Sequence, residues 1–573
     1  MSTPPAIVIL GVGALATARR IQPCYEGARV HGLQGRVNDA DVAYTELNAH
    51  LRELYSSGTP IVALCAAGIV IRCLAPLLAN KGVEPPVLAV AEDGSAVVPL
   101  RGGLSGVNTM AREIAAALDV PPAITTSGEL RFGACVLNPP DGYTLASIDQ
   151  GKRFVSDLLA GEATRSEGDA PWLDDVQLPR AEDARRAIRV TPLAWSGATD
   201  ELVIHPRSVV VAVDAKTAGD GLYERSLAAA QEHGLAAQSL AVLLAPLSLA
   251  SDPALRHAAD ALQVTLRFTA DDAQPARSAG MLSRSLRVPH KTLGAEQAHI
   301  AFAVAHAPLA PATVGSARGR LSVIGLGPGD ASLMAPAARA ALTQATDILG
   351  YETYVKMAGP FRAAQRVHGT DNREEMQRAR HAFELASEGR HVAMVSSGDP
   401  GVFAMAAAVL EALDDARNEP HSAAWAAVEL EIVPGVSAAL ATAAQAGAPL
   451  GHDFCMVSLS DNLKPWSIIE TRLRHAAEAD LVMAFYNPIS RARPWQLDKA
   501  RDIVREFRAP ATVVVLGRDI GRPGATLKTT TLSELKSAEV DMRTMVIVGS
   551  STTRAFRLDS SGKEWVYTPR WYE

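Results

Sequence analysis

The stretch Val323-Ile324-Gly325-Leu326-Gly327-Pro328-Gly329-Asp330 decides the fold of the carboxy-terminal half of the chain. Its apolar start predicts a buried strand. The glycines after it permit backbone conformations closed to other residues and let another group approach the main chain. Pro328 fixes one backbone angle and donates no amide hydrogen. We therefore predict a strand that opens into a ligand-binding turn, with an ordinary connecting turn as the alternative.

Three more turns of this kind follow in order, each after an apolar run. They are Ser396-Ser397-Gly398-Asp399-Pro400-Gly401, Pro434-Gly435-Val436-Ser437-Ala438 and Phe485-Tyr486-Asn487-Pro488. In open α/β sheets, ligands bind outside the carboxyl ends of the strands. The set therefore predicts one cleft, because ordinary connections do not require this order.

Two other nucleotide-binding patterns do not fit the first turn. A dinucleotide fingerprint needs a third glycine where Asp330 stands, and a phosphate-binding loop needs a Gly-Lys-Ser/Thr sequence that is absent. At the amino terminus, Gly11-Val12-Gly13 follows a strand-like run, but no acidic residue stands about 20 positions on to bind a ribose. A dinucleotide oxidoreductase is therefore disfavoured.

Composition restricts the class of protein. The chain has 573 residues, so a typical domain size of roughly 100–200 residues predicts three or four domains. A formal charge of −7 argues against nucleic acid and anionic membranes as partners. The five cysteines form no CxxC pair, which argues against a zinc site and is typical of a cytoplasmic protein. No signal peptide or membrane-length apolar run is evident.

Periodicity predicts an α/β, multi-domain chain, in which β-rich runs alternate with helical segments such as 108–118 and 221–233. The polar stretch 161–169 is predicted to be a loop or linker, and 307–317 an interdomain linker. The predicted strands are 6–10, 61–64, 87–90, 96–99, 208–213, 321–324, 391–395, 429–433, 481–485, 512–516 and 545–548.

The carboxy-terminal motifs resemble the tetrapyrrole methyltransferases that use S-adenosylmethionine, and most of all the branch that methylates carbon 17 of precorrin-3B. Besides the turns, the passages that carry the resemblance are Gly350-Tyr351-Glu352-Thr353-Tyr354, Phe485-Tyr486-Asn487-Pro488-Ile489-Ser490, Gly517-Arg518-Asp519-Ile520-Gly521-Arg522 and Val546-Ile547-Val548-Gly549-Ser550-Ser551-Thr552-Thr553-Arg554. The resemblance implies a two-lobed methylase fold over residues 320–573, preceded by a linker at 307–319. It also implies a homodimer formed through this domain.

The resemblance carries roles onto matching positions. Pro328 would lie in a loop beneath the substrate, next to the cofactor. The cofactor S-adenosylmethionine would contact Pro328, Ser397, Gly398, Asp399, Val402, Ser437, Ala438, Tyr486, Arg518, Thr544, Met545 and Val546. Asp399 has an alternative role as a turn residue that caps the next helix.

The substrate implied by the resemblance is a tetrapyrrole with many carboxylates, so basic side chains should line its trough. The candidates are Lys464, Arg491, Arg493, Arg522 and Arg554, together with Arg518, which is also a cofactor candidate. Methyl transfer needs mainly alignment, but contraction of the macrocycle favours acid–base groups. For these we name Asp330, His452 and Asp453, with a plain loop position as the alternative for His452.

The amino-terminal half resembles a second family of the same pathway, the CbiG-like cobalt-precorrin-5A hydrolases. The matching passages are Ala67-Gly68-Ile69-Val70-Ile71-Arg72, Ala75-Pro76-Leu77-Leu78, Asp93-Gly94, Gly106-Val107-Asn108 and Ile124-Thr125-Thr126. We expect CbiG-like units at 1–140 and 207–306, with a middle region at 141–206. Gly103 and 213–217 depart from the family pattern, so hydrolysis is in doubt and a tetrapyrrole-binding or structural role stays open.

Together these passages predict methylation of precorrin-3B at carbon 17 with ring contraction in cobalamin biosynthesis, by a cytoplasmic enzyme without a metal. Two alternatives stay open. The chain would otherwise methylate the cobalt-containing substrate, cobalt-factor III, or bind a tetrapyrrole without turnover.

Overall fold

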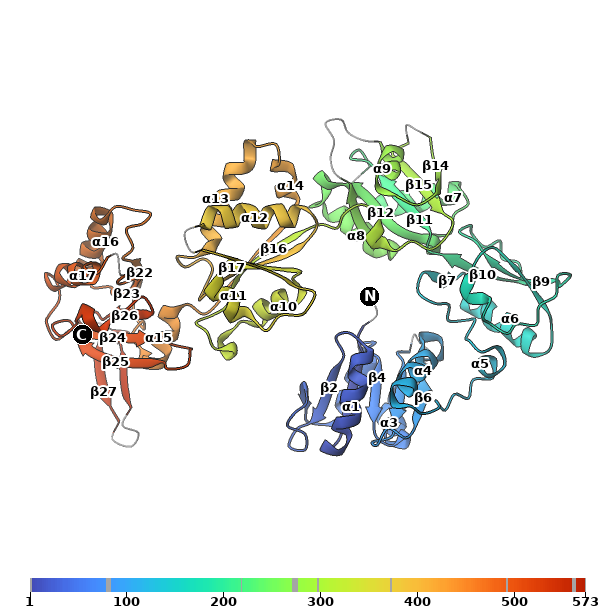
Figure 1. The fold of residues 1–573 in the computed structure, drawn as a ribbon, viewed down its shortest axis with the longest axis horizontal. Coiled ribbons are helices and arrows are strands. Elements are labelled where there is room, and N and C mark those ends of the chain that lie inside the picture. The colour runs from blue at the N-terminus through green and yellow to red at the C-terminus, as the bar shows by residue number, and fades with distance from the viewer. Residues whose placement is uncertain are drawn as a thin grey trace.

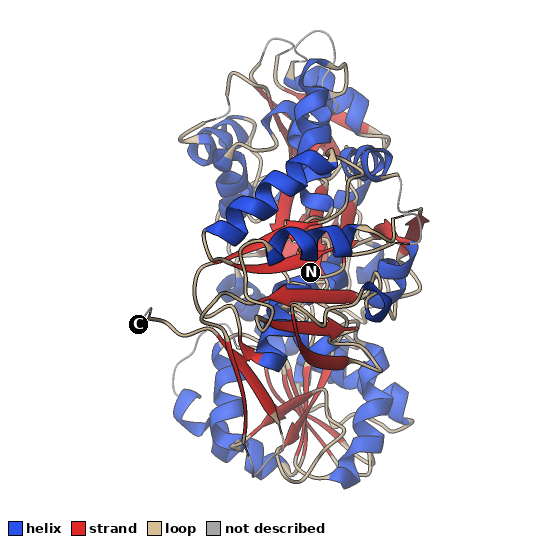
Figure 2. Ribbon diagram, turned by 90° about the vertical axis from the view of Figure 1, so that its left-hand side faces the viewer, coloured by secondary structure: helices blue, strands red, loops and turns tan. Residues whose placement is uncertain are grey.

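A computed structural model of the chain describes residues 3–78, 84–217, 219–269, 277–295, 298–371, 374–490, 493–558 and 563–571. These residues form six sheets, and the chain traces an arch in which each domain follows the previous one (Figure 1). Helices lie on both sides of the strands (Figure 2). Mixed helix and sheet throughout confirms the predicted α/β, multi-domain class.

The first sheet has the strand order β3-β2-β1-β4-β5-β6, and all neighbours pair in parallel except β5 and β6. Its elements are β1 (Ala6–Ile9), α1 (Leu15–Ile21), β2 (Arg29–Leu33), β3 (Val42–Tyr44), α2 (Leu47–Ser56), β4 (Ile61–Leu64), α3 (Ala67–Leu74), β5 (Val87–Val90), β6 (Val97–Arg101), α4 (Val107–Leu118) and α5 (Ser127–Phe132). The helix expected at 108–118 is confirmed as α4, which buries Ala111, Ile114 and Leu118 against the sheet.

The middle region folds into a four-stranded sheet with the order β7-β10-β9-β8. Its elements are β7 (Tyr143–Leu145), α6 (Ile148–Leu159), β8 (Thr164–Glu167), β9 (Arg186–Val190) and β10 (Glu201–Pro206). The loop predicted at 161–169 is therefore wrong in part, because its centre is the edge strand β8. Strand β8 is polar because it lies at the edge of the sheet beside β9, and Thr164, which also bridges to Arg180, is its fully buried residue.

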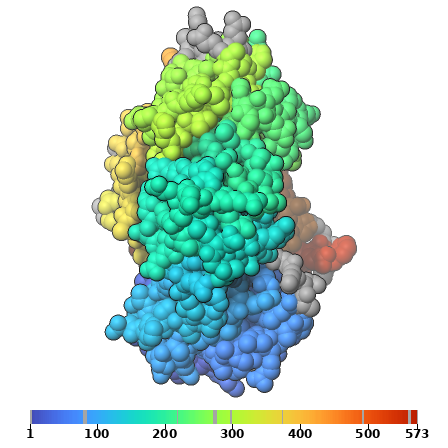
Figure 3. Space-filling model, turned by 90° about the vertical axis from the view of Figure 1, so that its right-hand side faces the viewer, coloured from blue at the N-terminus to red at the C-terminus, as the bar shows by residue number. Residues whose placement is uncertain are grey.

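The third sheet has the order β13-β12-β11-β15-β14. Its elements are β11 (Val209–Val213), α7 (Leu222–Glu232), β12 (Leu240–Pro246), α8 (Pro253–Leu262), β13 (Thr265–Thr269), α9 (Ser278–Ser285), β14 (His290–Leu293) and β15 (Ile300–Ala305). The first three domains stack in sequence order on one face of the molecule (Figure 3). The segment predicted as a linker packs here, since Leu309 and Val314 join the buried core under the sheet.

The fourth sheet, which we call the first lobe, is parallel throughout with the order β18-β17-β19-β16-β20. Its elements are β16 (Arg320–Gly325), α10 (Pro336–Gln344), β17 (Asp347–Tyr351), α11 (Glu352–Ala358), β18 (Arg366–Thr370), α12 (Glu375–Ser387), β19 (His391–Ser396), α13 (Met405–Asp415), α14 (Ser422–Ala427) and β20 (Glu429–Val433). Separate buried cores lie on its two faces. Because the strands are parallel, the segments that follow β16, β17, β19 and β20 emerge at one edge, and they include the first three of the predicted turns.

The remaining two sheets form the second lobe, with the orders β22-β23-β26-β24-β25 and β21-β28-β27. Its elements are α15 (Ala438–Ala446), β21 (Gly447–Ala448), β22 (Phe454–Ser458), α16 (Trp466–Glu478), β23 (Val482–Tyr486), α17 (Gln496–Arg505), β24 (Val513–Arg518), β25 (Thr526–Thr531), β26 (Thr544–Val548), β27 (Arg554–Arg557) and β28 (Glu564–Tyr567). Strands β22, β23 and β24 run in one direction, and β25 and β26 run in the other.

The two halves of the chain are packed together rather than merely joined. Ala427 at the end of α14 is buried in the core of the third domain. The Arg318 guanidinium donates to the Ala427 carbonyl over 2.9 Å. Farther along the arch, Arg362 of the first lobe lies 3.9 Å from Glu26 of the first domain. The amino-terminal half thus buttresses the first lobe.

Candidate functional site

The turns after β16 and β19 are held together by paired backbone hydrogen bonds. The Gly327 amide donates to the Gly398 carbonyl over 3.1 Å, and the Gly398 amide donates back over 2.7 Å. Both glycines have positive φ angles, 74° and 71°. A Cβ on Gly325 would stand 2.5 Å from the Gly398 carbonyl oxygen, so only glycine permits this approach. The predicted convergence of these two turns is present in the structure.

Asp399 connects the second turn to the third. Its Oδ1 accepts from the Gly401 amide over 2.8 Å, and its Oδ2 accepts from the Gly435 amide over 3.0 Å. The third turn then leads into α15, whose first turn is capped by the Ser437 hydroxyl, the acceptor for the Leu440 amide over 3.3 Å. Asp399 thus has a structural role between the turns, with its carboxylate at the site.

The fourth turn reaches the same place from the second lobe. The Tyr486 hydroxyl, at the end of β23, accepts from the Ala439 amide over 3.3 Å. Its ring lies 5.2 Å from the ring of Phe403 of the first lobe. The four turns therefore meet at the seam between the two lobes, where Ala438 and the half-buried Val402 also lie.

Arg522 follows β24 of the second lobe, and its side chain reaches across the seam to the first lobe. Its Nε donates to the Pro328 carbonyl over 2.9 Å, and a terminal nitrogen donates to the Ser397 hydroxyl over 3.2 Å. Pro328 itself is buried, and a Cβ on Gly521 would stand 2.8 Å from its ring. A single side chain of the second lobe thus fixes both glycine-rich turns of the first lobe.

Four more cofactor candidates lie at this edge of the second-lobe sheet or just inside it. Arg518 ends β24 opposite Thr544, which starts β26, and Asp541 accepts hydrogen bonds from both side chains over 3.0 and 2.9 Å. Met545 and Val546 continue inward as buried residues. Strand direction explains the grouping, because β23 and β24 end where β26 begins.

The structure places the other basic candidates at different edges of the second-lobe sheet. Arg493 lies beyond β22 and β23 at the same edge, where its guanidinium donates to Asp461 over 2.7 Å. That contact lowers the pKa of the Asp461 carboxyl. Lys464 lies in the neighbouring loop, and burial lowers the pKa of its ammonium group. Arg491 lies outside the described residues.

Arg554, His452 and Asp453 lie at the opposite edge of the second-lobe sheet. His452 and Asp453 immediately precede β22, which is parallel to β23, so they stand one strand length from Tyr486. The His452 ring accepts from the Asp453 amide over 2.8 Å. Arg554 begins the exposed strand β27 after β26. The structure does not bring these three residues to the seam.

Asp330, the third acid–base candidate, lies beside the seam but caps a short turn. Its Oδ1 accepts from both the amide and the hydroxyl of Ser332, each over 2.7 Å. These bonds lower the pKa of the Asp330 carboxyl. An exposed carboxylate in this state suits a base or a hydrogen-bond acceptor better than a proton donor.

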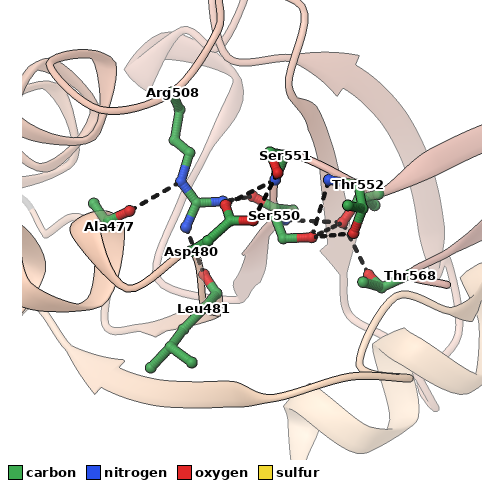
Figure 4. Close-up of polar contacts among 10 residues, drawn as sticks. Ala477, Asp480, Leu481, Arg508, Ser550, Ser551, Thr552 and Thr568 are labelled. Atoms are coloured by element: carbon green, nitrogen blue, oxygen red, sulfur yellow. Dashed lines mark hydrogen bonds and ion pairs between the residues drawn. The ribbon is translucent and has the colours of Figure 1, made fainter. Parts of the chain in front are cut away.

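The distinctive Gly549–Arg554 passage has a structural role in this fold. The buried Arg508 guanidinium donates to the carbonyls of Ala477, Gly549 and Leu481 and forms an ion pair with Asp480 (Figure 4). Asp480 in turn accepts from the amide and hydroxyl of Ser551 over 2.9 and 2.6 Å. We call this set the Arg508 clamp. It ties α16, β23 and β26 together at the edge remote from the seam.

Phe403 is a site residue that the sequence did not indicate. Its φ angle of 53° is unusual for a bulky side chain, and 52% of the residue is exposed. Strained residues of this kind cluster at ligand-binding sites because the surrounding structure must hold them in place. The only available signal was its position next to Val402 in the second turn.

The donor set at the seam fits an adenosine-containing sulfonium cofactor. It combines backbone amides and carbonyls, the Asp399 carboxylate and two aromatic rings, which suit an amino-acid group, a ribose and a flat base. Among the described residues, no group of three or more His, Cys, Asp or Glu side chains is placed to hold a metal ion. In the same part of the chain, no helix is both long and apolar enough to cross a membrane.

Comparison with known proteins matches both halves. The family model described as Tetrapyrrole (Corrin/Porphyrin) Methylases matches residues 320–536, and the Cobalamin synthesis G N-terminal model matches residues 49–129. A precorrin-3B C(17)-methyltransferase from Sinorhizobium sp is 49% identical over 254 residues, which covers 44% of this chain and 97% of that protein.

Further relatives match the same half of the chain. The cobalamin biosynthesis protein CobIJ of Mycobacterium tuberculosis is 46% identical over 258 residues, 44% of this chain, and the match spans about half (48%) of that protein. A probable cobalt-factor III C(17)-methyltransferase of Salmonella typhimurium is 41% identical over 233 residues, 41% of this chain and 93% of that protein. The crystal structure of the methyltransferase CobJ shares 49% identity and covers 44% of this chain and 100% of that one, with a TM-score of 0.41.

Proposed function

The chain belongs to the tetrapyrrole methylase family, and on that premise we propose that it methylates carbon 17 of precorrin-3B with contraction of the ring during cobalamin biosynthesis. The observation that carries the proposal is the convergence of four turns from both lobes, joined by Asp399, Tyr486 and Arg522. The Sinorhizobium relative of that name, matched over nearly its whole length, supports this choice of substrate.

S-adenosylmethionine would supply a methyl group already activated as a sulfonium, so the residues of the chain have mainly to align it with the acceptor carbon. We propose that Ser397, Gly398, Asp399, Val402, Ser437, Ala438 and Tyr486 hold the cofactor. Phe403, Arg518 and the residues 544–546 complete that wall. Pro328 and Arg522 would separate cofactor from substrate.

For ring contraction, Asp330 remains the acid–base candidate that lies near the seam. Its pKa is held below the usual range by Ser332, so it would accept rather than release a proton near neutral pH. Arg493 and Lys464 would contribute positive charge at the outer part of the same edge. Positive charge there suits a substrate that carries many carboxylates.

The test is anaerobic incubation of the purified protein with S-adenosylmethionine and either precorrin-3B or cobalt-factor III, followed by mass spectrometry. A gain of one methyl group with precorrin-3B is expected. A gain only with cobalt-factor III would move the chain to the cobalt-containing substrate. No gain with either, despite cofactor binding, would favour a tetrapyrrole-binding protein without turnover.

We propose a structural role for the amino-terminal half. The matched residue Asn108 donates to Thr126 over 3.0 Å and to the buried Glu129 over 2.6 Å, which joins α4 to α5 inside the first domain. Burial of Ala427 in the third domain supports a buttress for the first lobe. Lactone hydrolysis by the full chain, assayed with cobalt-precorrin-5A, would contradict this role.

We also propose that the protein acts in the cytoplasm as a homodimer formed through the methyltransferase domain, without nucleic acid. Exposed Phe556, Leu558 and Trp571, on and beside β27 and β28, support an apolar interface. The formal charge of −7 disfavours polyanionic partners. Light scattering of the purified protein measures the mass directly, and a monomer at micromolar concentration would contradict the dimer.

A further inference from the structure

Two arginines of the methyltransferase region are almost fully buried, and they differ in how their charge is balanced. Arg508 is 6% exposed and has an ion pair with Asp480 as well as three carbonyl acceptors (Figure 4). Arg378 is 3% exposed and forms no ion pair with any described residue. A buried charge is costly unless it is paired. The Arg378 charge therefore requires an explanation that the Arg508 charge does not.

The contacts of Arg378 place it behind the carboxyl edge of the first-lobe sheet. Its Nε donates to the Thr370 hydroxyl over 2.6 Å at the end of β18, one terminal nitrogen donates to the Asp371 carbonyl, and the other approaches the Met405 sulfur at 3.1 Å. A thioether is a weak acceptor. Glu374, Glu375 and Asp371 act on the guanidinium electrostatically without reaching ion-pair distance, and burial lowers its pKa.

Tyr354 lies near the same carboxyl edge of the first-lobe sheet as Arg378. It follows β17 on α11, and its ring lies edge-on to Tyr351 at 5.2 Å. Its hydroxyl makes no hydrogen bond with any described residue. Burial raises the pKa of the Tyr354 phenol, while the charges of Arg522 and Arg378 both act to lower it. Two guanidinium groups thus act on one phenol that has no partner.

The strand order of the sheet also places these groups close to one another. Thr370, Tyr351, Ser397 and Pro328 end or follow β18, β17, β19 and β16, which are consecutive neighbours in the sheet. Neighbouring strands lie about 4.8 Å apart. Arg522 is fixed over β16 and β19, Arg378 behind β18, and Tyr354 over β17. Like Arg378, Arg522 forms no ion pair with any described residue.

We propose that Tyr354 and Arg522 bind one carboxylate arm of the tetrapyrrole substrate, with Arg378 as a positioning residue behind them that supplies unbalanced positive charge. The inference rests on the proposed function and names a subsite within it. A carboxylate at this point would accept from the Tyr354 hydroxyl and the Arg522 guanidinium. It would anchor the macrocycle over the turn at Pro328, on which Arg522 is already fixed.

The direct test is steady-state methyl transfer with precorrin-3B by Tyr354→Phe and Arg378→Met, beside calorimetric titration with S-adenosylhomocysteine. Tyr354→Phe loses a hydrogen bond to a charged group, so its KM should rise about tenfold. Arg378→Met removes the positive charge behind the subsite, and its KM should also rise. The S-adenosylhomocysteine affinity should stay unchanged. Arg378→Lys should restore most of the KM because it returns the charge, which a purely packing role would not require.

Matched controls are Tyr567→Phe on β28 and Arg417→Gln, an exposed arginine of the first lobe paired with Asp414. Both should leave KM and the melting temperature as in the unaltered protein. If Arg378→Met does not fold, Tyr354→Phe and Arg378→Lys carry the test alone. Unchanged KM in Tyr354→Phe together with turnover by the unaltered protein would overturn the subsite and leave the proposed function standing.

A binding measurement separates failure of the subsite from failure of the function. Uroporphyrin, a tetrapyrrole with acetate and propionate arms, can be titrated by its fluorescence into each variant. Weaker binding to Tyr354→Phe without methyl transfer by the unaltered protein would retain the subsite and overturn the function. Equal binding to all variants would overturn the subsite, whether or not turnover is seen.

Discussion

At one edge of the second-lobe sheet Tyr486 contacts Phe403 of the first lobe, whereas at the other edge the Arg508 clamp joins only strand ends and helices of its own lobe. Both edges carry passages that are equally distinctive in sequence. Strand direction separates them, because β23 and β24 end, and β26 begins, at the seam. A distinctive passage therefore indicates the family, and topology decides whether it belongs to a binding site or to the scaffold.

The largest effect on stability should come from the Arg508 clamp. Asp480→Asn removes the charge that balances a buried guanidinium, so the free energy of unfolding should fall by about 3 kcal/mol. The kcat of the folded fraction should not change. Denaturant unfolding measures the first quantity and transfer assays the second.

The matched control for the clamp is Asp414→Asn, which breaks the exposed Asp414–Arg417 pair of 2.8 Å. Surface pairs contribute about 0–1 kcal/mol. Equal losses in the two variants would show that the Arg508 clamp is no more than a surface contact.

Asp399→Asn should have the largest effect on the cofactor at the seam. The new amide cannot accept from both Gly401 and Gly435, so we expect affinity for S-adenosylhomocysteine to fall about tenfold. Asp453→Asn is the same substitution at the opposite edge and should leave the affinity unchanged. Calorimetric titration compares the two, and a larger loss in Asp453→Asn would reverse the assignment of the edges.

Phe403→Leu tests the contribution of one ring at the seam. The aromatic contact with Tyr486 is lost while the apolar bulk is kept, so affinity for S-adenosylhomocysteine should fall about threefold. Phe454→Leu at the start of β22, a residue of similar exposure at the remote edge, is the control. If the two variants bind equally well, the exposed Phe403 ring has no part in the cofactor site.

His452→Gln should have the smallest effect. Its position before β22, at the remote edge, predicts that methyl transfer and ring contraction change by less than about twofold. Mass spectrometry of the products separates the two steps. Methylated but uncontracted product from this variant would restore His452 as an acid–base residue.

The sequence predicted several buried strands because their apolar runs are continuous, as in His391–Ser396 and Val209–Val213. It missed the equally buried strands β12, Leu240–Pro246, and β17, Asp347–Tyr351. It missed β25, Thr526–Thr531, because an edge strand with exposed threonines and a lysine has no apolar signature. It also missed the middle sheet, whose strands are short and interrupted by charged residues. Burial there depends on pairing partners that only the fold supplies.

For the candidate site, glycine and proline turns marked the right strand ends, because close backbone approach demands those residues locally. Side chains that reach the seam from elsewhere had no such mark. Phe403 comes from a strained turn, and Arg378, which lies behind the edge of the first-lobe sheet, comes from a helix. Conversely, His452 and Arg554 suited the chemistry by residue type, but both lie at strand starts that are remote from the seam.

Hydrogen exchange with and without S-adenosylhomocysteine tests the central claim that ligands bind at the seam and not at the remote edge. The account predicts added protection at the four turns, residues 326–330, 397–403, 435–440 and 486–490. It predicts no added protection at 449–453 or 549–554, or in the amino-terminal half. Protection centred on the Arg508 clamp or on the first three domains, with none at the four turns, would contradict it.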